Sequence, residues 1–225
     1  MLSAIILAAG QGRRLKAVGP KPLVKIGKFP AIIYSLESLN RHPDINEIVV
    51  VISASNQKAI TGALEKYPFK KIKAFVLGGK RRQDSVYNGL KKVSLNTDWV
   101  LIHDSARPLI DRQSITEVIL AAKKTGAAIL GVPVKATIKS IKSNGMVDKT
   151  LDRGNLWEIQ TPQVFKKELI LKAYKEYSKM NVTDDASLVE KLAKPIKIVL
   201  GSYENIKITT PEDLLFAQAI AGRKR

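Results

Sequence analysis

Ala4-Ile5-Ile6-Leu7-Ala8-Ala9-Gly10-Gln11-Gly12-Arg13-Arg14-Leu15 is the stretch that decides the fold, and Pro20-Lys21-Pro22 follows it closely. Its apolar first half predicts a short buried strand, and its second half predicts a small-residue turn that carries cations. Gly10 and Gly12 lack a Cβ atom, so the backbone N–H groups of the turn can come close to a ligand. Arg14 and Lys21 can then meet negative charge on that ligand. The stretch therefore predicts a phosphate site.

The glycine spacing narrows the kind of phosphate site. A dinucleotide-binding turn needs a third glycine where this chain has Leu15, and a P-loop needs a closing Gly-Lys-Ser/Thr that is missing here. A glycine turn with basic residues in and after it suits an enzyme that stabilises a triphosphate while one phosphoryl centre is attacked. An ordinary strand-to-loop turn with solvated arginines is the alternative.

Composition indicates an ordinary globular protein. The 225 residues are 45% hydrophobic and 26% charged, and no apolar run approaches the roughly 20 residues of a membrane span. The N-terminal apolar stretch lacks the charged region of a signal peptide. Without cysteine, the chain has no disulfide, thiolate metal site or thiol nucleophile. We expect a cytoplasmic protein without a membrane partner.

The formal net charge of +18 has three interpretations. Phosphate neutralisation would indicate nucleic-acid binding, and electrostatic steering would indicate small anionic substrates. The third interpretation is a solvated, lysine-rich surface. The lysines are spread along the whole chain without a stacking-aromatic pattern, so nucleic acid is an unlikely partner.

Apolar, β-rich runs alternate with helical patterns along the first 132 residues. The expected strands cover 2–7, 46–52, 72–77, 98–103 and 127–132, and the expected helices lie near 30–40, 56–66, 81–93 and 111–124. This order predicts an α/β, Rossmann-like, mostly parallel sheet with helices on both faces. Such sheets bind ligands beyond the C-terminal ends of their strands, so Gly10, Gly78-Gly79 and Asp104 should share one rim.

The alternation breaks after Pro133. Residues 134–153 contain short extended runs around Asn144-Gly145, which predicts an inserted hairpin arm. An isolated hairpin is marginal in water, so we expect it to pack on a partner chain; a plain surface hairpin is the alternative. Helices near 166–178 and 184–193, strands at 196–200 and 205–209 and a helix from Pro211 follow. We expect one domain, 1–225, that carries this arm.

Four further segments contain candidate site residues. In His103-Asp104-Ser105-Ala106-Arg107-Pro108, the aspartate could bind Mg²⁺ or a hydroxyl and Arg107 could hold an anion, whereas His103 fits a structural role. Gly78-Gly79 opens a helix, where anions are favoured. Thr183-Asp184-Asp185-Ala186-Ser187 fits helix capping, with Thr183 as the cap. Lys207 lies in an alternating run and is expected to face solvent.

These motifs, in this order, resemble the 2-C-methyl-D-erythritol 4-phosphate cytidylyltransferases over nearly the whole chain. The resemblance rests on the first stretch with Pro20-Lys21, on 78–86, 103–108, 183–187 and 205–209, and on Asp152-Arg153, Leu156-Trp157 and Gln160-Thr161-Pro162-Gln163 with Phe165. It implies an enzyme that joins CTP and methylerythritol phosphate, releasing pyrophosphate, in the non-mevalonate isoprenoid pathway. It also implies Mg²⁺, held mainly through the triphosphate and near Asp104, and a homodimer that exchanges the arm.

The resemblance also implies residue roles. The catalytic residues would be Arg14, Lys21, Arg153 and Lys207. CTP would contact Ala8, Ala9, Gly10, Gly12, Arg14, Lys21, Gly79, Ser85 and Asp104. Methylerythritol phosphate would contact Asp104, Arg107, Thr137, Arg153, Thr183 and Lys207, with Thr137 and Arg153 serving the partner's site.

Three residues depart from the family pattern: Pro22, Lys80 and Ala136, which stand where glutamine, an acidic residue and aspartate are usual. Ribitol-5-phosphate cytidylyltransferase is the alternative enzyme, and it would differ around the second substrate. A basic nucleic-acid-binding protein is the alternative from another class.

Overall fold

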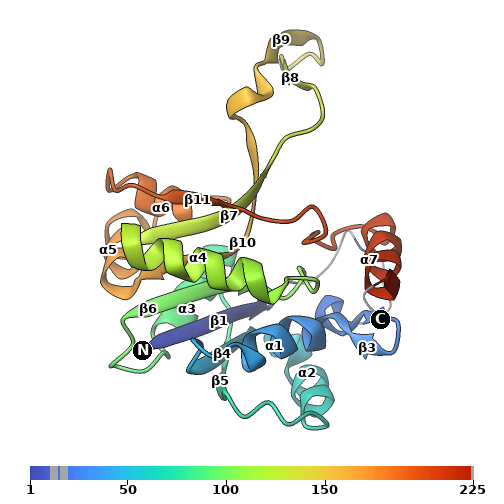
Figure 1. The fold of residues 1–225 in the computed structure, drawn as a ribbon, viewed down its shortest axis with the longest axis vertical. Coiled ribbons are helices and arrows are strands. Elements are labelled where there is room, and N and C mark those ends of the chain that lie inside the picture. The colour runs from blue at the N-terminus through green and yellow to red at the C-terminus, as the bar shows by residue number, and fades with distance from the viewer. Residues whose placement is uncertain (11–14, 16–19, 224–225) are drawn as a thin grey trace.

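A seven-stranded sheet forms the centre of the protein, with strand order β11-β7-β10-β6-β1-β4-β5 (Figure 1). The computed structural model describes residues 1–10, 15 and 20–223. The sheet strands are β1 (Leu2–Ala8), β4 (Glu47–Ile52), β5 (Ile72–Leu77), β6 (Trp99–Asp104), β7 (Ala127–Pro133), β10 (Trp157–Lys166) and β11 (Lys197–Leu200). The α-helices are α1 (Ala31–Arg41), α2 (Gln57–Leu64), α3 (Arg82–Leu90), α4 (Arg112–Thr125), α5 (Lys167–Tyr177), α6 (Ala186–Glu190) and α7 (Pro211–Arg223). The 3₁₀ turns are Lys21–Leu23, Ala54–Asn56 and Arg153–Asn155.

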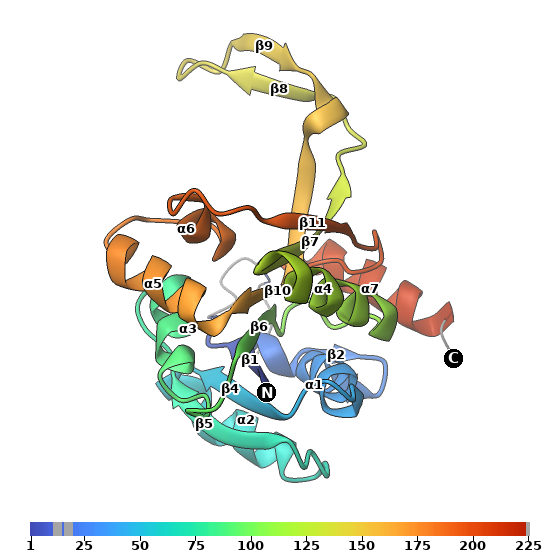
Figure 2. The ribbon, with the colours of Figure 1, turned by 60° about the vertical axis from the view of Figure 1, so that its left-hand side comes forward.

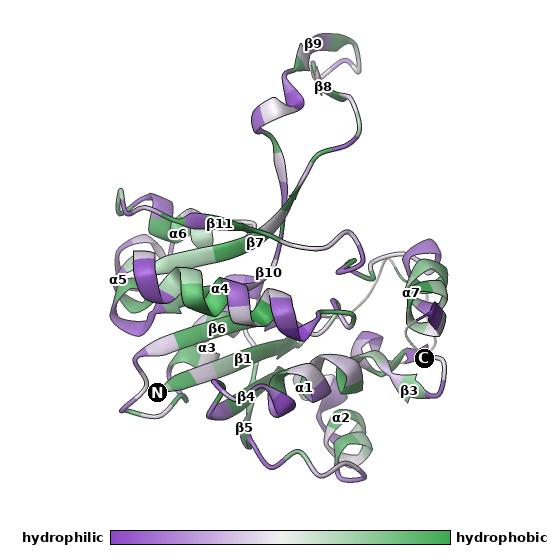
Figure 3. Ribbon diagram, viewed as in Figure 1, coloured by the Kyte–Doolittle hydropathy of each residue, from purple (hydrophilic) through white to green (hydrophobic). Residues whose placement is uncertain are grey.

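The sheet is mostly parallel and is covered on both faces, as the sequence predicts. β1 pairs in parallel with β4 and β6, and β5 and β11 also pair in parallel with their neighbours. Ile6 packs with α1, α2 and α4 on one face, whereas Ile5 packs with α3, α5 and α6 on the other. This double burial explains why the β1 sequence is a continuous apolar run. The turned view shows the helices on the two faces (Figure 2), and the hydropathy colouring shows the apolar strands between them (Figure 3).

β10 is a strand that the sequence analysis missed. It runs antiparallel between β6 and β7. Its pairing with β7 shifts between the pairs Ile159–Gly131 and Gln163–Ile129, so that β10 advances four residues while β7 advances two. The residues 160–162 therefore form a bulge, and such bulges re-aim side chains near functional sites.

Two local predictions near the C-terminal end are wrong. Residues 205–209 form no strand, because Ile208 is buried against α7 instead of pairing in a sheet. The helix predicted at 184–193 is α6, which begins only at Ala186. Its first turn is capped by Asp184, whose Oδ1 accepts a hydrogen bond from the Ser187 N–H at 3.1 Å, and not by Thr183.

The predicted hairpin arm is present and projects from the body (Figures 1 and 2). It consists of β8 (Ile138–Ile141) and β9 (Val147–Leu151), which pair antiparallel around a turn with Gly145 at φ 82°. A short separate pair, β2 (Lys25–Ile26) and β3 (Phe29–Pro30), precedes α1. Within the described residues, no helix combines the length and the hydropathy that crossing a bilayer would require.

Candidate active site

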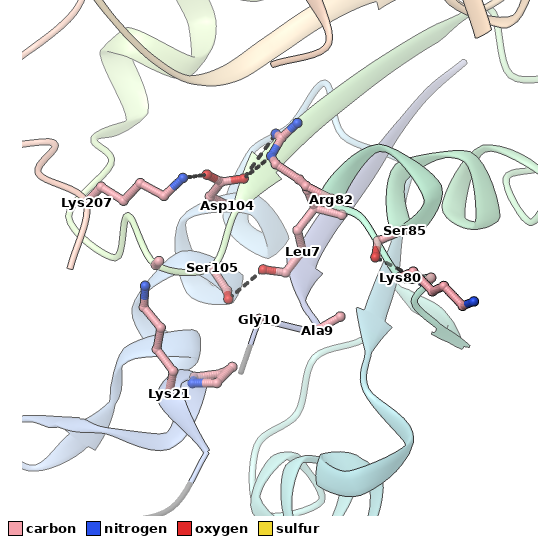
Figure 4. A pocket seen from close by; sticks show the side chains of 13 residues that line it. Leu7, Ala9, Gly10, Lys21, Lys80, Arg82, Ser85, Asp104, Ser105 and Lys207 are labelled. Atoms are coloured by element: carbon pink, nitrogen blue, oxygen red, sulfur yellow. Dashed lines mark hydrogen bonds and ion pairs between the residues drawn. The ribbon is translucent and has the colours of Figure 1, made fainter. Parts of the chain in front are cut away.

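A cavity of about 530 Å³ lies at the C-terminal ends of β1 and β6 (Figure 4). Gly10, Gly79 and Asp104 all line it, so the three loops that were expected on one rim do meet there. Lys21, at the start of a 3₁₀ turn, also lines the cavity. Ala9 lies beside Gly10, whereas Ala8 is buried at the end of β1. Gly12 and Arg14 lie outside the described residues.

The second glycine turn is held tightly against the first loop. A Cβ atom added to Gly78 would lie 2.7 Å from the Cβ of Ala9, and one added to Gly79 would lie 2.3 Å from the Cβ of Asp84. The Gly79 N–H donates a hydrogen bond to Ser85 Oγ at 3.1 Å. Both glycines are therefore required by close approach, and they bring backbone groups and Ser85 to the cavity wall.

Asp104 is the electrostatic centre of the site (Figure 4). Its Oδ1 accepts hydrogen bonds from Arg82 Nη2 at 3.1 Å and Nε at 3.2 Å, and its Oδ2 accepts one from Lys207 Nζ at 2.6 Å. Burial alone would raise the pKa of Asp104, but the charges of Arg82 and Lys207 outweigh burial and hold the pKa well below its usual range. Asp104 is therefore a carboxylate at neutral pH, and Lys207 faces the site instead of bulk solvent.

Arg82 is a site residue to which the sequence analysis gave no role. Its Nη1 donates to Asp185 Oδ2 at 2.7 Å, and Asp185 is fully buried and also accepts from Tyr174 Oη at 2.6 Å. Burial lowers the pKa of Arg82, but the charges of Asp185 and Asp104 outweigh burial and raise the pKa above its usual value, so the guanidinium stays charged. A cation at the first position of a helix is opposed by the helix dipole. That conflict was the available signal that Arg82 needs carboxylate partners.

A second cavity of about 350 Å³ is also lined by Asp104. It shares Arg82, Asp104 and Lys207 with the first cavity, and Arg107 and Thr183 line it. Two cavities therefore meet at one charged wall. This arrangement suits a reaction in which two anionic substrates approach each other.

His103 supports the wall from behind and is fully buried. Its Nε2 lies 3.0 Å from the Arg107 carbonyl oxygen, and its Nδ1 lies 3.1 Å from Thr161 Oγ1. The Arg107 carbonyl oxygen can only accept, so the ring proton resides on Nε2, and Nδ1 accepts from the Thr161 hydroxyl, whose oxygen in turn accepts from the Asp104 N–H at 3.0 Å. Burial lowers the pKa of His103 to about 4, so the ring is neutral and structural.

Arg107 is buried beneath the second cavity. Its Nη1 donates to the Asn205 carbonyl oxygen at 2.7 Å and its Nη2 to that of Ile159 at 3.1 Å. Burial lowers the pKa of Arg107, and the charge of Asp104 partly opposes that shift. Arg107 therefore ties β10, at the residue before the bulge, to the segment that carries Lys207.

Thr137 and Arg153 lie on the arm and line neither cavity. Both are exposed, and Arg153 Nη1 donates to the Lys135 carbonyl oxygen at the arm's own root. Within this subunit, the structure does not bring them to the residues with which the sequence analysis grouped them.

The described part of the chain places too few carboxylates together for a metal cage made by the protein alone. No group of three or more His, Cys, Asp or Glu ligands occurs among residues 1–10, 15 and 20–223. Asp104 is the one carboxylate among the described residues that line the first cavity, and both of its oxygens are paired. Mg²⁺ commonly binds through one or two carboxylates together with substrate phosphates. The donor set therefore fits a Mg²⁺ ion carried by a triphosphate.

Comparison with known proteins gives one consistent result. The family model described as 2-C-methyl-D-erythritol 4-phosphate cytidylyltransferase matches residues 2–223. A protein of that name from Desulforamulus reducens is 46% identical over 224 residues, covering 98% of this chain and 96% of the relative. One from Dehalococcoides mccartyi is 45% identical and covers 100% and 97%. The crystal structure of 4-diphosphocytidyl-2C-methyl-D-erythritol synthase from Anaerococcus prevotii has a TM-score of 0.87 at 37% identity, covering 99% of this chain and 96% of that chain.

Proposed function

The chain belongs to the 2-C-methyl-D-erythritol 4-phosphate cytidylyltransferase family, and from this premise we propose how its residues divide the reaction. The protein is a nucleotidyltransferase that joins CTP and 2-C-methyl-D-erythritol 4-phosphate in isoprenoid biosynthesis. The products of that reaction are 4-diphosphocytidyl-2-C-methyl-D-erythritol and pyrophosphate. Neither ribitol 5-phosphate nor nucleic acid is favoured as the partner.

The charged wall between the two cavities is the observation that carries the proposal. CTP occupies the first cavity, between the Gly10 loop and the turn at Gly79 and Ser85. Methylerythritol phosphate occupies the second cavity, beside Thr183. The two phosphates then meet at the wall formed by Arg82, Asp104 and Lys207.

The chemistry is an in-line displacement at phosphorus. An oxygen of methylerythritol phosphate attacks the α-phosphorus of CTP, and the bond to the β-phosphate bridging oxygen breaks with its electron pair leaving on pyrophosphate. The nucleophile is already an anion, so no general base is needed, which is consistent with the neutral, buried His103. Lys21, together with Arg14, stabilises charge that grows in the transition state, where stabilisation raises the rate.

Lys207 has a different task. With its ammonium 2.6 Å from Asp104, it lies at the boundary between the cavities and positions the attacking phosphate. Asp104 keeps this ammonium in place and presents a carboxylate to the hydroxyls of the acceptor. When bound, Mg²⁺ would neutralise charge on the triphosphate, and Asp104 is the carboxylate of the described cavity lining that would hold it.

The arm completes the site in a second subunit. Thr137 and Arg153 are exposed and away from both cavities of their own subunit, and the exposed Ile141, Met146 and Val147 give the arm an apolar surface for a partner. We infer a homodimer in which Thr137 and Arg153 of one subunit reach the acceptor cavity of the other. We also place this one-domain enzyme in the cytoplasm, which cell fractionation would test.

The decisive experiment measures pyrophosphate release from CTP and Mg²⁺ with either methylerythritol phosphate or ribitol 5-phosphate. We expect release with the first acceptor only. Lys21→Ala should lower turnover by about 10²–10³-fold, as for loss of an oxyanion-hole donor. Lys28→Ala, an exposed change outside the cavity, is the matched control and should keep the wild-type rate. Equal activity of Lys21→Ala and Lys28→Ala would contradict the role of Lys21.

A further inference from the structure

Lys207 lies on a segment without regular secondary structure. Between the end of β11 at Leu200 and the start of α7 at Pro211, no helix or strand is formed. No strand ladder therefore fixes Lys207, although its ammonium lies 2.6 Å from Asp104. Something else must hold this backbone, because a small misplacement of a charged group in an active site is costly.

Asn205, two residues before Lys207, is held to β10 by its side chain. It is fully buried, and its Nδ2 donates to the Thr161 carbonyl oxygen at 2.9 Å and to Gln160 Oε1 at 3.1 Å. Thr161 also anchors Asp104, because its Oγ1 accepts from the Asp104 N–H. One bulge residue thus holds Asp104 directly and Lys207 through Asn205.

The backbone around Lys207 is fixed from both sides to the loop that follows β6. The Asn205 carbonyl oxygen accepts from Arg107 Nη1 at 2.7 Å, and the Ile208 N–H donates to the Ala106 carbonyl oxygen at 2.8 Å. Ile208 is also buried. Among the contacts of the described residues, Asn205 is the only residue of 205–207 whose side chain hydrogen-bonds to the β10 bulge.

We propose that Asn205 is a positioning residue for Lys207, which sets the distance from the Lys207 ammonium to Asp104 and to the acceptor phosphate. The inference rests on the proposed role of Lys207. Asn205 is buried and lines neither cavity, so it acts because its carboxamide fixes the chain two residues before the lysine. Loss of that carboxamide lets the segment move away from the β10 bulge, and a shift of about 1 Å suffices for about a 10²-fold loss.

A double-mutant cycle on the full-length enzyme tests the proposal. Asn205→Ala, Lys207→Ala and the double variant are assayed for pyrophosphate release at varied CTP and varied methylerythritol phosphate. We expect Asn205→Ala to lower kcat/KM for methylerythritol phosphate by roughly 10²-fold. The KM for CTP should change by less than about threefold. In the Lys207→Ala background, Asn205→Ala should lower kcat/KM for methylerythritol phosphate by less than about threefold, since the effects of coupled residues are not additive.

Ser202→Ala is the matched control in the same segment. Among the described residues, the contact of Ser202 Oγ is local, since it accepts the N–H of Glu204 at 3.1 Å, so we expect wild-type kinetics. Asn205→Ser, which keeps a short donor, carries the cycle if Asn205→Ala does not fold; CTP binding without acceptor reports folding.

The outcomes separate the inference from its premise. Asn205→Ala, or Asn205→Ser, could lower kcat/KM equally with and without Lys207. That result would overturn the inference, because Asn205 would then act generally on the fold. Full activity of Lys207→Ala would overturn the role of Lys207 and the inference with it. A loss confined to the background that contains Lys207 supports both.

Discussion

Replacement of Arg82 by methionine should destabilise the protein by about 3 kcal/mol. Arg82 pairs with Asp104 and with the fully buried Asp185, so its loss leaves one carboxylate buried with only the Tyr174 hydroxyl. Removal of one partner of a buried ion pair costs about 3–5 kcal/mol. We take the lower end because 26% of the Arg82 side chain is exposed. At about 2–4 °C per kcal/mol for a chain of this length, the melting temperature should fall by roughly 6–12 °C.

The assay is urea and thermal unfolding of Arg82→Met, Asp185→Asn and the double variant at neutral pH. Asp185→Asn in the Arg82→Met background should recover about 1–2 kcal/mol, because it removes the uncompensated buried charge. Arg41→Met is the control; its pair with Glu37 is exposed and should contribute less than about 0.5 kcal/mol. A loss below about 1 kcal/mol for Arg82→Met, or a further loss in the double variant, would refute this reasoning.

Three further results are expected. Burial lowers the pKa of His103 from 6.5 to about 4, so between these pH values the unfolded chain binds a proton that the folded chain does not. The free energy of unfolding therefore falls as the pH falls. In urea unfolding, His103→Gln should abolish about 2 kcal/mol of the decrease in unfolding free energy between about pH 7.5 and 5. Gly79→Ala, which places a Cβ 2.3 Å from a side-chain carbon of α3, should lose about 1–3 kcal/mol, whereas Gly62→Ala, with open space in α2, should unfold no more easily than wild type. Mixed Arg153→Ala and Lys207→Ala subunits should regain about one quarter of the wild-type activity, since half of the dimers would hold one intact site; mixtures as inactive as either parent would contradict the shared site.

The strands that could be predicted from sequence are those buried on both faces. In β1 and β4 both faces meet helices, so nearly every residue is apolar and the pattern is plain. β10 was missed because its middle reads Gln160-Thr161-Pro162-Gln163, and a proline within a run argues against a strand. Those polar groups are satisfied only by contacts distant in sequence, such as the bond from Asn205 to the Thr161 carbonyl oxygen.

The site was predictable in its loops but not in its contacts. Gly10 and Gly79 could be predicted to share one rim because each follows a strand, and parallel strands end together. The alternation around Lys207 resembled a strand, but Ile208 packs under α7 instead. The pairing of Lys207 with Asp104 spans 103 positions, and no local pattern encodes such a contact.

The bulge in β10 also determines where the chain can change length. Ile159 and Gln163 pair with β7 on either side of the bulge at 160–162. Within the bulge, the Thr161 side chain contacts Asp104 and the Gln160 side chain contacts Asn205. One residue inserted after the bulge would turn Gln163 to the opposite face of the sheet, because strand side chains alternate with a period of two. One residue inserted at the arm tip, 142–146, would only enlarge an exposed turn. Arms of different lengths can therefore be grafted at the tip, whereas β10 must be transplanted whole.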